Sequence, residues 1–85
     1  MNPLKRLQTL PDPQIQRWLM KVERVGVELL VLSLVGSEAE LSEAIYRNMS
    51  PRAKQSLRRE VELRTKSAPT LKQIAAAQGE LAVLL

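Results

Sequence analysis

The 85-residue sequence contains no cysteine and no histidine, and Trp18 and Tyr46 are its only aromatic residues. Without cysteine the chain can form no disulfide, no thiolate zinc site and no cysteine nucleophile. Without histidine it lacks the commonest general base and the commonest metal ligand. Its three glycines are scattered, so they do not build a phosphate-binding loop. These absences argue against an enzyme, and we expect no cofactor and no small-molecule substrate.

Long hydrophobic runs are also missing. The longest apolar stretch, residues 25–35, is interrupted by Gly26, Glu28 and Ser33. It is far shorter than the roughly 20 residues that span a bilayer. The first ten residues carry Lys5 and Arg6 but no apolar run of the kind found in a signal peptide. We therefore expect a cytoplasmic location.

The composition predicts one small helical domain over residues 1–85. Hydrophobic residues make up 45% and charged residues 26% of the chain, which is typical of a globular protein. The core must be built from leucine, valine, isoleucine, alanine and methionine, because aromatics are only 2%. Such a composition favours an all-α fold over an all-β fold, which relies on aromatic and β-branched residues.

Helix-capping patterns divide the chain into short helices. They predict a helix or turn near residues 3–7 and helices at 12–23, 26–35, 38–48, 51–64 and 70–84. The caps that set these bounds are Asp12 before Pro13, Ser37 with Glu40 after Gly36, Ser50 before Pro51, and Thr70 with Gln73.

Apolar residues recur at helical spacing in each segment. Ile15, Trp18 and Val22 predict one buried face, with contact to a partner as the alternative for Trp18. The last helix is expected to turn an apolar face inward, made by Leu71, Ile74, Ala75, Gln78, Leu81 and Leu85. Residues 26–35 are apolar almost all round, which predicts a buried central helix, with a buried strand as the alternative.

Positive charge is concentrated in residues 51–66, where six basic and two acidic residues give a net charge of +4, equal to that of the whole chain. On a helical wheel most of these side chains lie opposite Leu57. They predict an electrostatic surface for a protein partner, and the alternative is a solvated face with pairs such as Arg58–Glu62. The interrupting acids and the lack of interleaved aromatics argue against nucleic acid. The candidate partner-binding residues are Arg52, Arg58, Arg59, Glu60, Glu62 and Lys66.

Two further features have competing explanations. Asn48 and Ser50 form a distinctive corner, which we interpret as structural, with Ser50 capping a helix and Asn48 bonding the turn. The apolar C-terminus, with Leu81, Leu84 and Leu85, predicts self-association. Its alternative is that the tail folds back on the core.

Four short blocks follow one another along the chain. The first is D-P-Q-I-Q-R-W-L-M-K-V (residues 12–22), and the second is L-S-L-V-G (residues 32–36). The third and sharpest is I-Y-R-N-M-S-P-R-A (residues 45–53), and the fourth is P-T-L-K-Q-I-A-A-A-Q (residues 69–78). In this order and spacing they resemble the C-terminal domain of the bacterial flagellar motor switch protein FliG, which carries N-M-S-x-R-A at the corresponding corner.

The resemblance implies an armadillo-like, right-handed arrangement of five or six helices. It also implies a non-enzymatic rotor module that serves motility and chemotaxis through contacts with other switch proteins or the stator. The implied place is the cytoplasmic side of the inner membrane, at the flagellar basal body. The alternative is a divergent helical interaction or scaffold domain without a motor role, and a small basic nucleic-acid binder comes last.

The charged positions that face the stator in that family are partly changed here. The family's lysine before the glycine is Val35, and the arginine after N-M-S-x is kept as Arg52. The acidic pair that follows is Arg59 and Glu60, and the basic position near Thr70 is not matched. A few extra residues fall near 24–28 and near Ser67. One basic charge and one acid are thus kept, one charge is lost and one is reversed.

Overall fold

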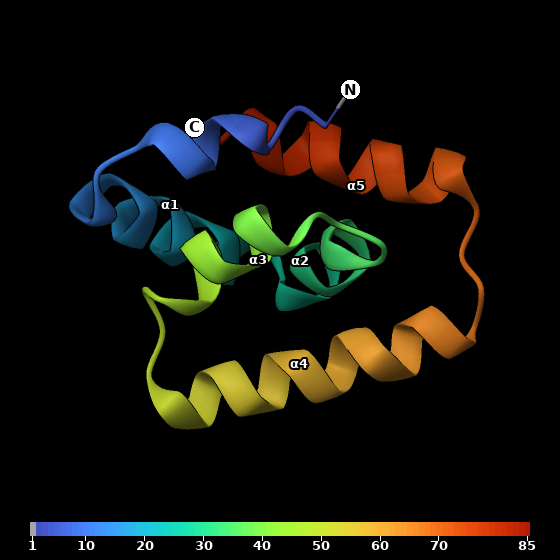
Figure 1. Ribbon diagram of the computed structural model, residues 1–85. Coiled ribbons are helices and arrows are strands. Elements are labelled where there is room, and N and C mark those ends of the chain that lie inside the picture. The colour runs from blue at the N-terminus through green and yellow to red at the C-terminus, as the bar shows by residue number, and fades with distance from the viewer. Residues whose placement is uncertain (1) are drawn as a thin grey trace.

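Five α-helices and one short 3-10 helix make up residues 2–85, the part of the chain that the computed structural model describes. No strand occurs within these residues. The all-α prediction is therefore confirmed, the strand alternative for residues 26–35 is wrong, and the armadillo-like arrangement stays a prediction. The elements are η1 (Lys5–Thr9), α1 (Asp12–Val25), α2 (Val27–Leu34), α3 (Ala39–Tyr46), α4 (Pro51–Lys66) and α5 (Leu71–Ala82) (Figure 1).

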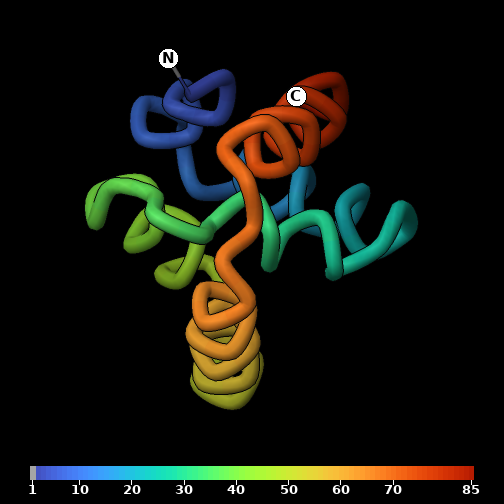
Figure 2. The backbone as a smooth tube through the Cα atoms, turned by 90° about the vertical axis from the view of Figure 1, so that its right-hand side faces the viewer, coloured from blue at the N-terminus to red at the C-terminus, as the bar shows by residue number. Residues whose placement is uncertain are grey.

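The helices α2 and α3 lie between two outer layers (Figure 1). On one side are η1 and α5, and on the other side is α4. α2 contacts α1, α4 and α5, whereas α3 contacts η1. Figure 2, in which α4 is seen end-on, shows this helix standing apart from the rest as a ridge. Much of its circumference therefore faces solvent.

The core draws apolar side chains from every element. α1 contributes Ile15, Trp18 and Val22, as its spacing predicts, and Trp18 is only 2% exposed. α2 buries Leu30, Ser33 and Leu34, and its Leu29 and Val31 are partly buried against the core. The core cluster is Leu4, Leu7, Ile15, Trp18, Val22, Leu30, Leu34, Leu41, Ala44, Ile45, Tyr46, Leu57 and Leu81.

The prediction that residues 26–35 are buried all round is wrong for the first turn of α2. Val27 is 50% exposed, and Val25 on the other side of Gly26 is 54% exposed. Both flank the corner between α1 and α2, where Gly26 has φ +138°. A corner at the surface leaves its flanking side chains in solvent, whatever their polarity.

Two of the four predicted caps form. The Ser50 hydroxyl accepts a hydrogen bond from the Ala53 N–H at 3.2 Å. Thr70 and Gln73 make a reciprocal capping box, with bonds of 3.1 Å and 2.9 Å. These bonds satisfy backbone N–H groups that the first turn of a helix leaves free.

The other two predicted caps are wrong. α1 begins at Asp12 after the N-cap Pro11, so Asp12 lies inside the first turn. Its carboxylate instead accepts hydrogen bonds from Arg47 and Asn48. Ser37 does not cap α3, because its hydroxyl shares a 2.7 Å hydrogen bond with the Ser42 hydroxyl.

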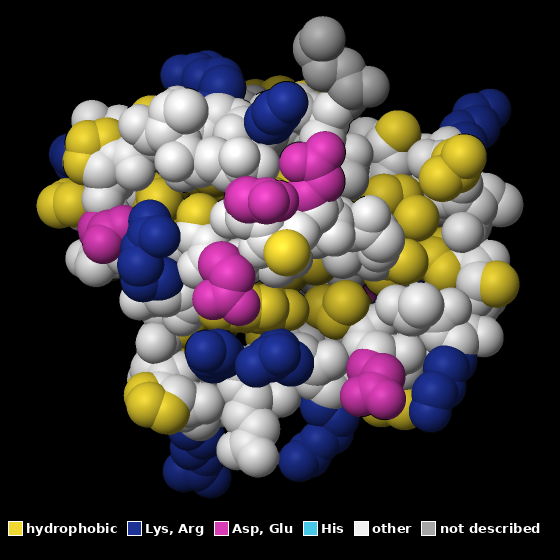
Figure 3. Space-filling view, viewed as in Figure 1, with side chains coloured by type: hydrophobic (Ala, Val, Ile, Leu, Met, Phe, Trp, Pro, Cys, Tyr) yellow, Lys and Arg dark blue, Asp and Glu magenta, His cyan; other side chains and the backbone are white. Residues whose placement is uncertain are grey.

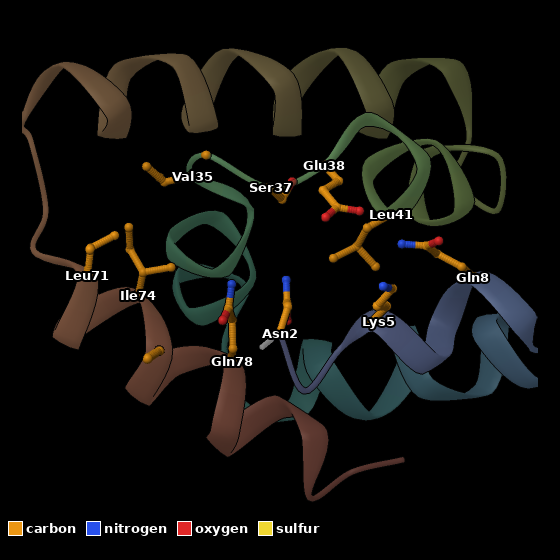
Figure 4. A pocket seen from close by; sticks show the side chains of 12 residues that line it. Asn2, Lys5, Gln8, Val35, Ser37, Glu38, Leu41, Leu71, Ile74 and Gln78 are labelled. Atoms are coloured by element: carbon orange, nitrogen blue, oxygen red, sulfur yellow. The ribbon is translucent and has the colours of Figure 1, made fainter.

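The inner face of α5 begins one turn later than predicted. Ala77, Gln78 and Leu81 are buried, but Leu71 is 85% exposed. Ala75, also predicted to face inward, is exposed as well. The first turn of α5 borders an open groove of about 620 Å³, whose lining includes Leu71, Ile74 and Val35 (Figure 4). Leu71 therefore lies at the rim, where no helix covers it.

Candidate protein interface on α4

The helix α4 carries the candidate site and is anchored by very few side chains. Leu57 is its one buried residue, and Ala53 and Val61 beside it are half-buried. These three make the narrow apolar stripe that their spacing predicts. The charged residues predicted to bind a partner are all exposed. We call them the α4 charged face: Arg52, Arg58, Arg59, Glu60, Glu62 and Lys66.

A hydrogen-bonded corner sets the start of α4. The Asn48 side-chain amide donates to the Ala44 carbonyl oxygen at 2.8 Å and to Asp12 Oδ1 at 3.3 Å. Its Oδ1 accepts a bond from Gln16 Nε2 at 3.0 Å. Together with the Ser50 cap, these bonds join the end of α3 to α1 and turn the chain into α4. The structural interpretation of Asn48 and Ser50 is confirmed.

Asp12 and Arg47 form an ion pair at the same corner. Arg47 donates from Nε and Nη2 to Asp12 Oδ1, at 3.2 Å and 3.0 Å. The hydrogen bonds from Arg47 and then Asn48 hold the pKa of the Asp12 carboxyl below its ordinary value of 3.8. Because the charged form of Asp12 accepts these bonds, the corner depends on its ionisation.

The charges of α4 are not paired with one another. Among residues 2–85, the ion pair between Asp12 and Arg47 is the single one within 4.0 Å. The alternative considered for these residues is a solvated face with ion pairs along the helix, and the Arg58–Glu62 pair named for it does not form. Figure 3 shows the lysine and arginine side chains gathered over α4, with few acidic groups among them.

Some of the predicted residues meet in one shallow hollow along α4, with a volume of about 480 Å³. Arg58, Arg59 and Glu62 line it, whereas Arg52, Glu60 and Lys66 do not. The sequence interpretation missed Lys54, which is half-buried and also lines this hollow. Its spacing could have revealed it, since the lining residues follow one helical face. They are Pro51, Lys54, Gln55, Arg58, Arg59 and Glu62.

Tyr46 of α3 lies against Arg58, one of the residues that line the hollow. The Arg58 guanidinium carbon lies 5.6 Å from the centre of the Tyr46 ring, a cation–π contact. Tyr46 is 7% exposed, and its burial raises the pKa of its hydroxyl. Sequence reasoning did not connect these residues, because the contact arises only when α4 packs beside α3.

The candidate self-association residues lie at the other end of the molecule. Leu81 is fully buried, so it serves the core of its own chain and is not available to a second copy. Leu84 and Leu85 are half-buried and pack against that core. These contacts agree with the alternative that the tail folds back on the core, and self-association through Leu84 and Leu85 stays a prediction.

The chemistry available at the α4 charged face is electrostatic attraction and hydrogen bonding by guanidinium and ammonium groups. No cluster of three or more acidic, cysteine or histidine side chains within residues 2–85 could hold a metal ion. None of the described helices is long and apolar enough to cross a membrane.

Comparison with known proteins gives one match. A family model described as the FliG C-terminal domain matches residues 1–85, the whole chain. Searches of curated proteins and of solved structures give no match. The match covers the corner at Asn48, the capped start of α4 and the α4 charged face.

Proposed function

The chain belongs to the FliG C-terminal domain family, and on that premise we propose that it is a non-enzymatic part of the flagellar motor switch. Residues 1–85 act as one module that works through contacts with other switch proteins or with the stator. Its place is the cytoplasmic side of the basal body. The α4 charged face is the surface that meets the partner.

One observation carries the choice of this surface. The side chains of the α4 charged face are exposed and make no ion pair with the rest of the described chain. Unpaired charges on a projecting helix steer a partner of complementary charge and set the register of the complex. The few apolar anchors of α4 bind it to the core and leave its outer surface to a partner.

Affinity capture of the tagged chain from its native cells tests the proposal. The lysate is treated with nuclease, so that proteins held only through nucleic acid are lost. We expect switch or stator proteins to be recovered. Capture of unrelated proteins alone would show that the family fold serves as a scaffold without a motor role.

A pair of variants ties the capture to α4. The double reversal Arg52→Glu/Arg59→Glu should lose the captured motor proteins and impair swimming. Arg17→Glu/Arg24→Glu is the matched control, because these exposed arginines lie on α1 and change the net charge equally. If both variants lost the captured motor proteins to the same extent, the assignment of the partner-binding surface to α4 would be contradicted.

A further inference from the structure

An open groove of about 620 Å³ lies between η1, the segment that joins α2 to α3, and the first turns of α5. Figure 4 shows Val35, Leu71 and Ile74 at one end of this groove and Lys5 and Glu38 at the other. Leu71 is 85% exposed. The apolar end is therefore removed from water only when another molecule covers it.

The two charges of the groove have no partner within the chain. Lys5 of η1 and Glu38 before α3 make no ion pair within 4.0 Å in residues 2–85. An apolar surface with one unpaired cation and one unpaired anion beside it fits a molecule of matching composition. Such a molecule offers apolar side chains together with both an acid and a base.

The corner between α1 and α2 has this composition. Val25 and Val27 are 54% and 50% exposed, and Arg24 and Glu28 flank them in the sequence. Both charged side chains are exposed and make no ion pair within 4.0 Å among the described residues. Of the large hydrophobic side chains exposed in this part of the chain, the two valines are the pair closest together in sequence. The chain thus carries the complement of its own groove.

Backbone hydrogen bonds fix the corner before any contact forms. The Gly26 N–H donates to the Val22 carbonyl oxygen at 2.8 Å, and the Leu29 N–H donates to the Gly26 carbonyl oxygen at 3.3 Å. Gly26 itself has φ +138°, which lets α2 follow α1 directly. Valine side chains have few rotamers to lose on burial. A rigid corner of this kind therefore binds with little loss of entropy.

The groove and the corner lie on opposite sides of the molecule. Figure 2 shows the corner between α1 and α2 on the side away from η1 and from the segment between α2 and α3. Two copies therefore cannot fill each other's grooves at the same time. A copy whose groove is filled keeps its own corner free, so the contact can repeat from copy to copy.

We propose that the groove binds the corner between α1 and α2 of a second copy of this chain, in a head-to-tail contact. The two valines of the corner cover the apolar end of the groove, against Leu71. Glu28 of the corner meets Lys5, and Arg24 of the corner meets Glu38. No residue of α4 lines the groove, so the contact leaves the α4 charged face open and goes beyond the proposed function.

The contact is small, which sets how it is measured. One corner covers less than the roughly 1,200 Å² that a stable interface buries in total. We therefore expect dissociation constants between about 1 μM and 1 mM. In sedimentation velocity over this range of concentrations, the mean mass of the full chain should rise beyond that of a dimer. A mass that stays at the monomer value at every concentration overturns the proposal.

Two blocked variants test the head-to-tail geometry. Leu71→Asp blocks the groove and Val25→Asp/Val27→Asp blocks the corner, all at exposed positions, and circular dichroism confirms that both variants are folded. Each variant alone should stay monomeric. Their mixture should form a dimer and nothing larger, because one copy keeps its corner and the other keeps its groove. A mixture that forms no dimer overturns the head-to-tail contact.

Met20→Asp/Leu63→Asp is the matched control for the corner variant. These positions are 59% and 54% exposed and lie outside both surfaces, so this variant should associate as the native chain does. Equal loss in the control would show unspecific apolar association. Association that persists in both blocked variants would assign it to another surface, such as the tail with Leu84 and Leu85. Either result overturns the assigned groove.

A charge swap tests how the two copies are oriented. Lys5→Glu and Glu28→Lys should each weaken the association about threefold, since each replaces an exposed attraction by a repulsion. The double variant Lys5→Glu/Glu28→Lys has the net charge of the native chain and should regain the native affinity. Losses that add in the double variant overturn the pairing of these two residues.

Discussion

Trp18 donates a hydrogen bond from its indole Nε1 to the carbonyl oxygen of Leu81 at 3.0 Å. The two residues are 63 positions apart in the sequence, so this bond closes α1 onto the last turn of α5. One turn further along α1, Lys21 Nζ donates to the Leu84 carbonyl oxygen at 3.3 Å. The apolar C-terminus is thus bound to the core by α1.

The bond from Trp18 leads to a first prediction. Trp18→Phe removes the donor and part of the buried ring, and should lower the free energy of unfolding by about 1–3 kcal/mol. The Leu81 carbonyl keeps its bond from the Leu84 N–H, which limits the loss. Urea unfolding followed by circular dichroism measures the change, since the variant has no tryptophan fluorescence. Met20→Ala is the control, because Met20 is 59% exposed, and it should change the free energy of unfolding by less than about 0.5 kcal/mol. If Trp18→Phe and Met20→Ala lowered it by the same amount, the prediction would be contradicted.

A second prediction concerns Leu57, the one buried side chain of α4. Leu57→Ala should lower the free energy of unfolding by about 2–4 kcal/mol, because it removes buried side-chain carbon atoms and leaves a cavity under the helix. The amide hydrogens of α4 should then exchange faster than those of α1 and α5. Leu63→Ala is the matched control, since Leu63 lies on the same helix and is 54% exposed. It should cost less than about 0.5 kcal/mol. Uniform acceleration of exchange across all helices would contradict a local role for Leu57.

A third prediction follows from the pKa of Asp12. Since the folded-state pKa lies below the ordinary value of 3.8, the carboxylate stabilises the fold above that ordinary value. This contribution is lost as the pH falls through the lowered pKa. Asp12→Asn should therefore lower the free energy of unfolding at neutral pH. It should also reduce the difference between the free energies of unfolding at neutral and at acid pH. Urea midpoints measured from neutral pH down to strongly acid pH test this.

The same prediction can be checked at the residue itself. An NMR titration of the Asp12 carboxyl carbon should give a pKa below 3.8 in the native chain. Arg47→Met removes the main donor and should move the pKa upward. A pKa that stays unchanged in this variant would show that the Arg47 hydrogen bonds are not the cause.

A fourth prediction contrasts two glycines that receive the same substitution. Gly36 has φ +70°, so Gly36→Ala should destabilise the fold by about 1 kcal/mol. Gly79 lies inside α5, and a Cβ there would meet no atom within 4 Å. Gly79→Ala should stabilise the fold by about 0.5–1 kcal/mol, since alanine is the better helix former. Thermal unfolding measures whether each variant is less or more stable than the native chain. Unfolding temperatures that change in the same direction in both variants would contradict the prediction.

Local chemistry determined the helices of this protein. The caps at Ser50 and Thr70 depend on residues three positions away, and the inner face of α1 depends on spacings of three and four. These interactions close within one or two helical turns, so they can be inferred from the order of residues. The exposure of the α4 charges also follows from the chain, because six cations in sixteen residues cannot be buried together.

Tertiary structure decided what these local patterns could not. Asp12 meets Arg47 and Asn48 instead of capping its own helix, since packing of α1 beside α3 offers stronger donors than a backbone N–H. Leu71 and Val27 stay exposed because no other helix covers those ends. Arg58 lies over Tyr46 only because the fold brings this part of α4 next to the end of α3. The reason is common to all three: a contact between residues distant in sequence depends on where whole helices lie, and no local pattern of residues encodes that placement by itself.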